Sequence, residues 1–152
     1  MTNCLSKIRR ASLADAPAIT SCAAAAYTPY VTRIGKPPAP MLEDYSQVIT
    51  RHDVFVLTLG EKIAGVLVLI PQQGRLLLDN VAIHPDYQGR GFGRRLFGFA
   101  EKEAKRARVD IITLYTNEQM TENIELYKKL GFVETERKIE QGYRRVYMQK
   151  AI

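Results

Sequence analysis

Three glycines at alternate positions, Gly89, Gly91 and Gly93, follow an apolar run that stops at His84-Pro85. A proline removes a hydrogen-bond donor from a strand and so favours its end. Glycine lets the backbone approach a bulky ligand, and the first amide groups of a following helix have no partner within it. A strand, a glycine turn and a helix start in this order form an anion site, so the stretch predicts a phosphorylated ligand.

Positive charge surrounds the same turn, from Arg90, Arg94 and Arg95. Two other phosphate-binding loops do not fit. Arg94 stands where a GxGxxG dinucleotide fingerprint has its third glycine, and no GxxxxGK[ST] sequence occurs. A tight strand-to-helix turn without a ligand is the alternative to an anion site.

A second polar pair lies downstream in a helical stretch. Asn123 and Tyr127 are four residues apart, so they share one face of the predicted helix. Gly131 follows as a typical helix-ending residue. Taken alone, Asn123 is better explained as an exposed polar residue, and Tyr127 as a core tyrosine whose hydroxyl is bonded locally.

Together these residues resemble a known family. The pattern Gln88-x-x-Gly91-x-Gly93 resembles the acyl-CoA pyrophosphate signature of the GNAT superfamily of N-acetyltransferases. The pattern Asn123-x-x-x-Tyr127-x-x-x-Gly-Phe resembles that superfamily's second motif, in the right order. The resemblance implies an enzyme that moves an acetyl group from acetyl-CoA to an amine acceptor by direct attack in a ternary complex. A non-catalytic acyl-CoA-binding regulatory module is the alternative, although it would not need Tyr127.

The resemblance also implies roles for individual residues, and it implies no metal site. Backbone N–H groups of the turn would bind the pyrophosphate, from Gln88, Gly89, Arg90, Gly91, Gly93 and Arg94. Val81 and Ile83 would pair through their backbone with the pantetheine arm, and an N–H there would polarise the thioester carbonyl as an oxyanion donor does. Asn123 would hydrogen-bond the arm, and Tyr127 would protonate the departing thiolate.

Asp79 is the candidate base. An alkylammonium has a pKa of about 10, so at pH 7 it must lose a proton before it attacks. A carboxylate can accept that proton directly or through water. Strict alternation along the strand predicts that Asp79 lies on the same side as Val81 and Ile83. A structural carboxylate is an equal alternative.

The acceptor is not identified by the sequence. In the resembled family the acceptor pocket lies between the loop that joins the first two helices and the terminal strands. Those segments here supply Tyr30, Arg33, Glu43, Tyr45, Tyr143, Arg144 and Arg145. Small amines, amino acids, antibiotics and protein lysines all stay open.

The composition fits one domain over residues 1–152, with 46% hydrophobic and 25% charged residues.

The net charge of +6 suits an anionic cofactor. No nucleic-acid-binding motif accompanies the dispersed basic residues, so a nucleic-acid partner is the weaker alternative. The longest apolar run, Ile63–Ile70, is too short for a bilayer, so no membrane partner is expected. No apolar signal core precedes Ser12, so a cytoplasmic protein is expected. Cys4 and Cys22 are expected to be free and reduced. The oligomeric state stays open, a homodimer included.

The candidate site residues are positioned by the secondary structure around them. The expected order of elements along the chain is a strand, two helices, three strands, a helix, a strand, a helix and two strands. The expected fold is α/β (α+β in some schemes), a GNAT-like mixed, mostly antiparallel sheet with about four helices on both faces. The proline-rich Thr28–Pro40 is predicted as a loop. The expected strands cover Lys7–Arg10, Val54–Leu59, Ile63–Ile70, Leu76–His84, Asp110–Tyr115, Phe132–Glu136 and Gly142–Gln149. The expected helices begin with one that starts after the capping-box-like Ser12 and Asp15, with Pro17 in its first turns, and continue with Met41–Arg51, Gly91–Arg108 and Thr121–Leu130.

Overall fold

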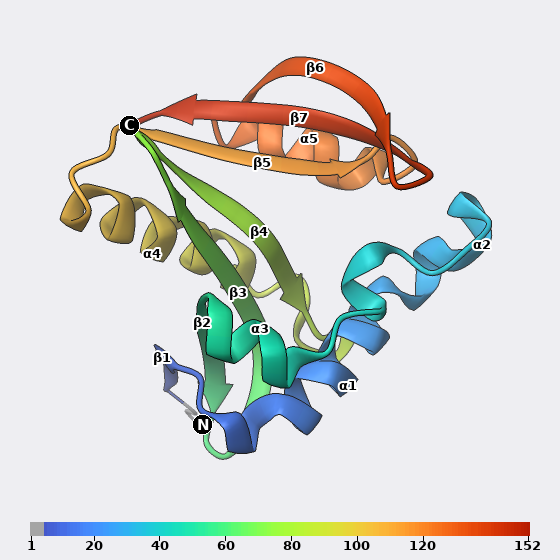
Figure 1. Cartoon of the computed structure of the whole chain (residues 1–152). Helices are drawn as coiled ribbons and strands as arrows, with labels where there is room; N and C mark the ends of the chain where they lie inside the picture. The colour runs from blue at the N-terminus through green and yellow to red at the C-terminus, as the bar shows by residue number, and fades with distance from the viewer. Residues whose placement is uncertain (1–4) are drawn as a thin grey trace.

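The computed structural model describes residues 5–152, and its central feature is a seven-stranded sheet. The strands lie in the order β1-β2-β3-β4-β5-β7-β6 (Figure 1). They are β1 (Ser6–Arg10), β2 (Asp53–Leu59), β3 (Lys62–Gln72), β4 (Arg75–Ile83), β5 (Ile111–Asn117), β6 (Val133–Glu140) and β7 (Tyr143–Ala151). All neighbours are antiparallel except β4 and β5, which confirms the predicted mixed sheet.

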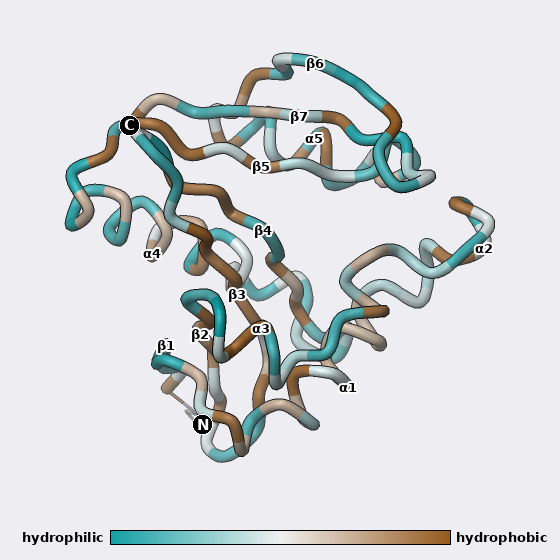
Figure 2. The backbone as a smooth tube through the Cα atoms, viewed as in Figure 1, coloured by the Kyte–Doolittle hydropathy of each residue, from teal (hydrophilic) through white to brown (hydrophobic). Residues whose placement is uncertain are grey.

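Four longer helices cover the two faces of this sheet. Helices α1 (Ala16–Tyr27) and α3 (Tyr45–Arg51) pack on one face, while α4 (Phe92–Arg106) and α5 (Thr121–Lys129) pack on the other (Figure 1). β2 and β3 are buried on both faces, as their continuous apolar runs predict. β6 is an exposed edge strand and carries mostly hydrophilic residues (Figure 2). Among the helices of the described residues, none is long and apolar enough to cross a membrane.

β4 and β5 separate soon after they pair. Only Leu76–Leu78 pair with Ile112–Leu114, whereas β4 continues beside β3 as far as Ile83. Beyond the paired residues the two strands diverge, so that the sheet opens like a V (Figure 1). The unpaired edge of β4 therefore faces a gap at the centre of the molecule.

A β-bulge lies on β4 beside this gap. Val68 is opposite Asn80 and Leu69 is opposite Leu78, which leaves Asp79 as an extra residue without a partner on β3. A bulge of this kind bends its strand and redirects side chains. It separates the half of β4 that pairs with β5 from the half that borders the gap.

The region between α1 and α3 differs from the predicted loop. It contains η2 (Thr28–Tyr30), α2 (Val31–Ile34) and the start of η3 (Ala39–Met41). Pro29 and Pro40 are tolerated because each occupies the first turn of a short helix, where its missing N–H is not needed, whereas Pro37 and Pro38 lie between the helices. The prediction that all of Thr28–Pro40 is irregular was therefore wrong.

Other boundaries moved by a few residues. α3 begins at Tyr45 instead of Met41, because the Asp44 carboxylate accepts the Ser46 N–H at 3.0 Å and starts the helix there. Leu42, which precedes this start, is 67% exposed. In α4, Ala100 and Ala104 are buried, while Ala107 is exposed just beyond its end. Cys22 is a buried free thiol; the expectation for Cys4 lies outside the described residues.

Candidate active site

The glycine turn joins β4 to α4 through η4 (Pro85–Tyr87). Gly89 and Gly91 have φ angles of 79° and 82°, in the left-handed region that favours glycine. Gly93 lies in the first turn of α4 without a positive φ, and a Cβ built there meets no atom within 4 Å. The local backbone therefore explains why glycine is needed at positions 89 and 91. It does not explain the glycine at position 93.

Unpaired amide groups point out of this turn. The first intrahelical bond at this end of α4 is from the Arg95 N–H to the Gly91 carbonyl, at 3.1 Å. The preceding amides of Phe92, Gly93 and Arg94 therefore lack a partner within the helix. The Gln88 N–H differs from the expectation, because it donates to the Pro85 carbonyl at 3.3 Å. Its side-chain Nε2 donates to the Ile83 carbonyl at 3.0 Å, so Gln88 ties the turn to β4.

The three arginines of the turn diverge. Arg94 lines the cleft beside the turn, whereas the Arg90 guanidinium lies over the Tyr87 ring at 5.5 Å. Arg95 Nη1 donates to the Ser6 carbonyl on β1 at 2.8 Å. The predicted cluster of positive side chains is thus reduced to one that faces the cleft.

A first cleft, here the glycine-turn cleft, extends from the turn along the open edge of β4 to α5. Its lining is Tyr30, Val81, Ile83, Tyr87, Gln88, Gly89, Gly91, Phe92, Gly93, Arg94, Phe97, Glu122, Asn123, Leu126 and Tyr127. The structure thereby brings together every residue expected to touch the cofactor except Arg90. It brings them together from β4, the turn, α4 and α5.

The backbone of β4 is open toward this cleft. The His84 N–H donates to the Ala64 carbonyl directly opposite, at 2.9 Å, which makes these residues a hydrogen-bonded antiparallel pair. Such pairs alternate with non-hydrogen-bonded ones, so Val81 and Ile83 direct their peptide groups away from β3. β5 has already diverged there, and an extended ligand can occupy the place of the missing strand.

A second cleft, here the tyrosine cleft, lies where β4 and β5 diverge and is bordered by α1, η3, the start of α3, α5 and β7. Its lining is Tyr27, Pro38, Ala39, Pro40, Glu43, Tyr45, Val48, Val68, Leu78, Asp79, Asn80, Val81, Leu114, Tyr115, Thr116, Asn117, Met120, Asn123, Tyr127, Tyr143 and Arg145. Val81, Asn123 and Tyr127 line both clefts. The two clefts therefore meet where β4 faces α5.

The bulge places Asp79 in the tyrosine cleft. Leu78 and Val81 both belong to the α4 side of the sheet, so Asp79 and Asn80 between them turn to the other side. The expectation that Asp79 shares a face with Val81 and Ile83 was wrong, because strict alternation fails at a bulge. The Asp79 carboxylate accepts the Tyr115 hydroxyl at 3.0 Å. Burial and the Asp79 charge raise the pKa of Tyr115 to about 12, which keeps this hydroxyl a donor.

A chain of buried hydrogen bonds supports the bulge. The Tyr27 hydroxyl donates to Asn80 Oδ1 at 2.6 Å, and Asn80 Nδ2 donates to the Tyr45 hydroxyl at 3.1 Å. Tyr45 in turn donates to the Pro40 carbonyl at 2.6 Å, which fixes the η3 segment over the cleft. Sequence reasoning missed Tyr27, Asn80 and Tyr115, and the one available signal was the polar Asp-Asn pair inside an apolar strand.

Tyr127 is buried in an aromatic cluster but presents a free hydroxyl. Its ring centroid lies 5.5 Å from that of Phe97 and 6.3 Å from that of Phe132, and the residue is 7% exposed. Burial raises the pKa of its hydroxyl well above the usual value. Within residues 5–152 no hydrogen bond to this hydroxyl is formed, and no fully buried polar side-chain atom lacks a partner. The Tyr127 oxygen therefore opens into the junction of the two clefts.

The residues expected around the acceptor divide between the clefts. Glu43, Tyr45, Tyr143 and Arg145 line the tyrosine cleft, while Tyr30 lines the glycine-turn cleft.

Arg33 and Arg144 line neither cleft. Arg33 pairs with Glu122 of α5 through two bonds of 2.6 and 2.7 Å, and Arg144 lies 3.9 Å from Glu118. No group of three or more His, Cys, Asp or Glu side chains in the described part of the chain could hold a metal ion.

Comparison with known proteins gives one consistent family. The model of the acetyltransferase (GNAT) domain matches residues 50–134, more than half of the chain. The Bacillus subtilis (strain 168) protein named uncharacterized N-acetyltransferase YvbK is 27% identical over 100 residues, which are 65% of this chain and 63% of that protein. The match thus spans less than two thirds of that relative.

Solved structures show the same fold. The ribosomal-protein-S18-alanine N-acetyltransferase of Escherichia coli superposes with a TM-score of 0.79 at 23% identity, over 97% of this chain and 94% of that one. The PaiA N-acetyltransferase of Thermoplasma acidophilum, in complex with coenzyme A, gives 0.80 at 18% identity, over 97% and 99%. At these identities the likeness concerns the fold alone.

Proposed function

Because the chain belongs to the GNAT acetyltransferase family, we propose that it transfers an acetyl group from acetyl-CoA to an amine acceptor within a ternary complex. The observation that carries the proposal is the meeting of two chemically different clefts at Tyr127. One has unpaired backbone donors suited to a phosphate-bearing ligand, and the other has carboxylates suited to an amine. The complex of PaiA with coenzyme A supports the choice of cosubstrate.

In this proposal acetyl-CoA occupies the glycine-turn cleft. The amides of the turn bind its pyrophosphate, with Phe92 joining the expected donors Gly89, Arg90, Gly91, Gly93 and Arg94. Gln88 acts by holding the turn against β4. The pantetheine arm pairs with the backbone of Val81 and Ile83, whose carbonyls also lie within hydrogen-bond distance of the Tyr27 hydroxyl and of Gln88 Nε2, and Asn123 hydrogen-bonds the same arm.

The transfer then takes place at the junction. The neutral amine attacks the thioester carbon, a C–N bond forms, and the carbonyl oxygen takes negative charge that the Val81 N–H stabilises. The C–S bond breaks as Tyr127 donates its proton to the sulfur. Asp79, directly or through water, takes the proton that the amine nitrogen loses.

The experiment is to mix the protein with acetyl-CoA and a set of primary amines and to measure thiol release together with the acetylated product. Thiol release that depends on the amine supports the proposal. Tight CoA binding with no thiol release for any amine would favour the regulatory module. Salt-dependent binding of random duplex DNA without CoA would favour the nucleic-acid alternative.

Asp79→Asn is expected to lower kcat/KM most at low pH, where few amine molecules are already neutral. A general base typically raises the reaction rate by about 10²–10⁴-fold when no other group can accept the proton. Because water can share this role, we expect a loss of roughly tenfold near pH 6.5 that shrinks toward pH 9. The measurement is the pH–rate profile with a single primary amine.

Two control variants separate proton transfer from structure. Asp110→Asn removes an exposed carboxylate outside both clefts and should leave the profile unchanged. Tyr115→Phe removes the hydrogen bond to Asp79 but keeps the carboxylate, so its loss should not grow as the pH falls. A loss in Asp79→Asn that is equal at every pH would show that the residue is structural.

A further inference from the structure

The tyrosine cleft is acidic although the chain as a whole is basic. The net charge is +6, yet the cleft contains the carboxylates of Asp79 and Glu43. Within residues 5–152, neither has a Lys, Arg or His nitrogen within 4.0 Å. Burial and the charge of Asp79 raise the pKa of Glu43, against a smaller opposing effect of His52.

The one positive side chain of the lining, Arg145, is already engaged. Its guanidinium lies over the Tyr115 ring at 4.3 Å and 3.4 Å from the Glu140 carboxylate, and its side chain is 13% exposed. Its charge is therefore balanced by groups of β5 and β6. The carboxylates of Asp79 and Glu43 therefore decide the charge of the ligand that the cleft prefers, which is positive.

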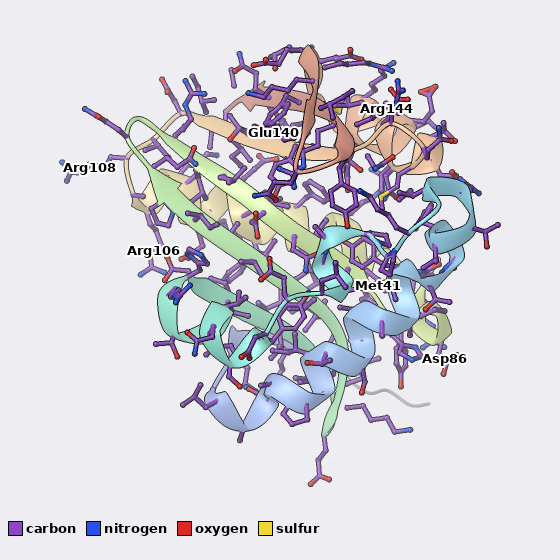
Figure 3. All side chains as sticks on the ribbon, turned by 45° about the vertical axis from the view of Figure 1, so that its right-hand side comes forward. Met41, Asp86, Arg106, Arg108, Glu140 and Arg144 are labelled. Carbon is purple, nitrogen blue, oxygen red and sulfur yellow. The ribbon has the colours of Figure 1, made fainter. Side chains whose placement is uncertain are left out.

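The walls of the cleft also suit a cation. Aromatic faces attract cations, and five tyrosines line the cleft: Tyr27, Tyr45, Tyr115, Tyr127 and Tyr143. The Tyr115 ring already holds Arg145 and the Tyr143 ring holds Lys36, at 4.3 and 4.1 Å from the ring centroids, so the other three rings are left for a ligand. The η3 segment covers the cleft from one side, and Figure 3 shows its Met41 between α1 and the strands that carry Glu140 and Arg144. The start of β7 is tied to the loop that precedes η3, because the Tyr143 hydroxyl donates to the Pro37 carbonyl at 2.6 Å.

The two ends of the cleft differ. The inner end holds Asp79, which is half-buried, and the unbonded hydroxyl of Tyr127, which is 7% exposed and opens toward the acetyl group in the proposed complex. The outer end holds Glu43, which is exposed. An amine at the inner end can react, while a cation at the outer end can only bind.

From this arrangement we propose that the acceptor is a small alkyl amine with a second cationic group, such as an alkyl diamine. One nitrogen lies between Asp79 and Tyr127 and is acetylated, and the other binds Glu43 at the mouth. The product is the monoacetylated diamine, which keeps one cation; coenzyme A leaves as the thiol and one proton is released. The inference rests on the proposed function, because it names the acceptor for the same site.

The test compares four acceptors of equal chain length at saturating acetyl-CoA: butylamine, 1,4-diaminobutane, 4-aminobutan-1-ol and 4-aminobutanoate. We expect kcat/KM for 1,4-diaminobutane to exceed that for butylamine by roughly tenfold, of which about twofold is the statistical gain of a second amine. 4-Aminobutan-1-ol should resemble butylamine, and 4-aminobutanoate should be the poorest. Equal values for diamine and monoamine, after the twofold correction, would overturn the inference.

Glu43→Gln locates the second cation. It should reduce the preference for the diamine over butylamine by roughly fivefold, whereas Glu61→Gln in the exposed turn between β2 and β3 should keep it. An unchanged preference in a folded Glu43→Gln protein would overturn the assignment, and a preference for 4-aminobutanoate would indicate that Arg145 selects the acceptor. CoA binding without thiol release from any amine would overturn the proposed function, and this inference with it.

Discussion

Gly93→Ala is expected to weaken the binding of coenzyme A by roughly 10- to 100-fold, the equivalent of losing one charge-assisted hydrogen bond. Gly93 lines the glycine-turn cleft, and its Cβ position is empty in the free protein. A methyl group there meets no protein atom, but it stands where the pyrophosphate must approach the amides of the turn. The dissociation constant, measured by calorimetry, checks the expectation.

Gly98→Ala is the matched control. Gly98 lies in the same helix, its Cβ position is equally empty, and it is outside both clefts. Both changes remove a helical glycine, so each should stabilise the fold by about 1 kcal/mol. Gly91→Val is a weaker test, because at a φ of 82° the side chain strains the backbone with or without a ligand. Equal affinity for CoA in the Gly93 and Gly98 variants would refute the pyrophosphate assignment.

The glycine turn could be predicted because all its information is local. A terminating proline, left-handed glycines and a helix start require residues that are adjacent in the sequence. The same holds for Asn123 and Tyr127, whose spacing alone places them on one side of α5. The side chains of Arg90 and Arg95 could not be placed in this way, because each is oriented by a contact, with Tyr87 or with Ser6, that charge does not encode.

The acceptor side depended on one extra residue in β4. Alternation is a reliable guide to a regular strand, and it fails where the register with β3 shifts. Asp79-Asn80 interrupts the run from Leu76 to Ile83 with two residues of low strand propensity, which in hindsight marks the bulge. Its consequence is large, because it moves Asp79 from the proposed cofactor side of the sheet to the proposed acceptor side.

Contacts between distant segments make up the rest of the tyrosine cleft. Tyr27 meets Asn80 from the end of α1, and Tyr143 meets Pro37 from the β6–β7 turn. Each pair joins residues more than 50 positions apart, so no periodicity in the sequence could relate them. The family resemblance predicted which segments form the pocket, but the acidic character of the cleft emerged only when Arg145 was seen to be engaged.

Tyr127→Phe is expected to lower kcat by roughly 10- to 100-fold, while the KM for acetyl-CoA changes little. The coenzyme A thiol has a pKa of about 8.5 by analogy with cysteine, so its thiolate leaves moderately well without help. A general acid therefore contributes near the lower end of the usual 10²–10⁴-fold range or below it. Because burial raises the pKa of Tyr127, the hydroxyl stays protonated as the pH rises toward 10, and the ratio of the two rates should stay constant over that range.

The Tyr127→Phe substitution should remove the hydroxyl without disturbing the fold. The Tyr127 ring stays packed between Phe97 and Phe132, and its hydroxyl has no partner in the described chain to leave unpaired, so the melting temperature should barely change. Tyr147→Phe removes a hydroxyl outside both clefts and serves as the control. Single-turnover rates at saturating acetyl-CoA are needed, because slow product release would conceal a slower chemical step. If those rates match the wild type, Tyr127 is a core residue, and the thiolate leaves the junction without a proton from the protein.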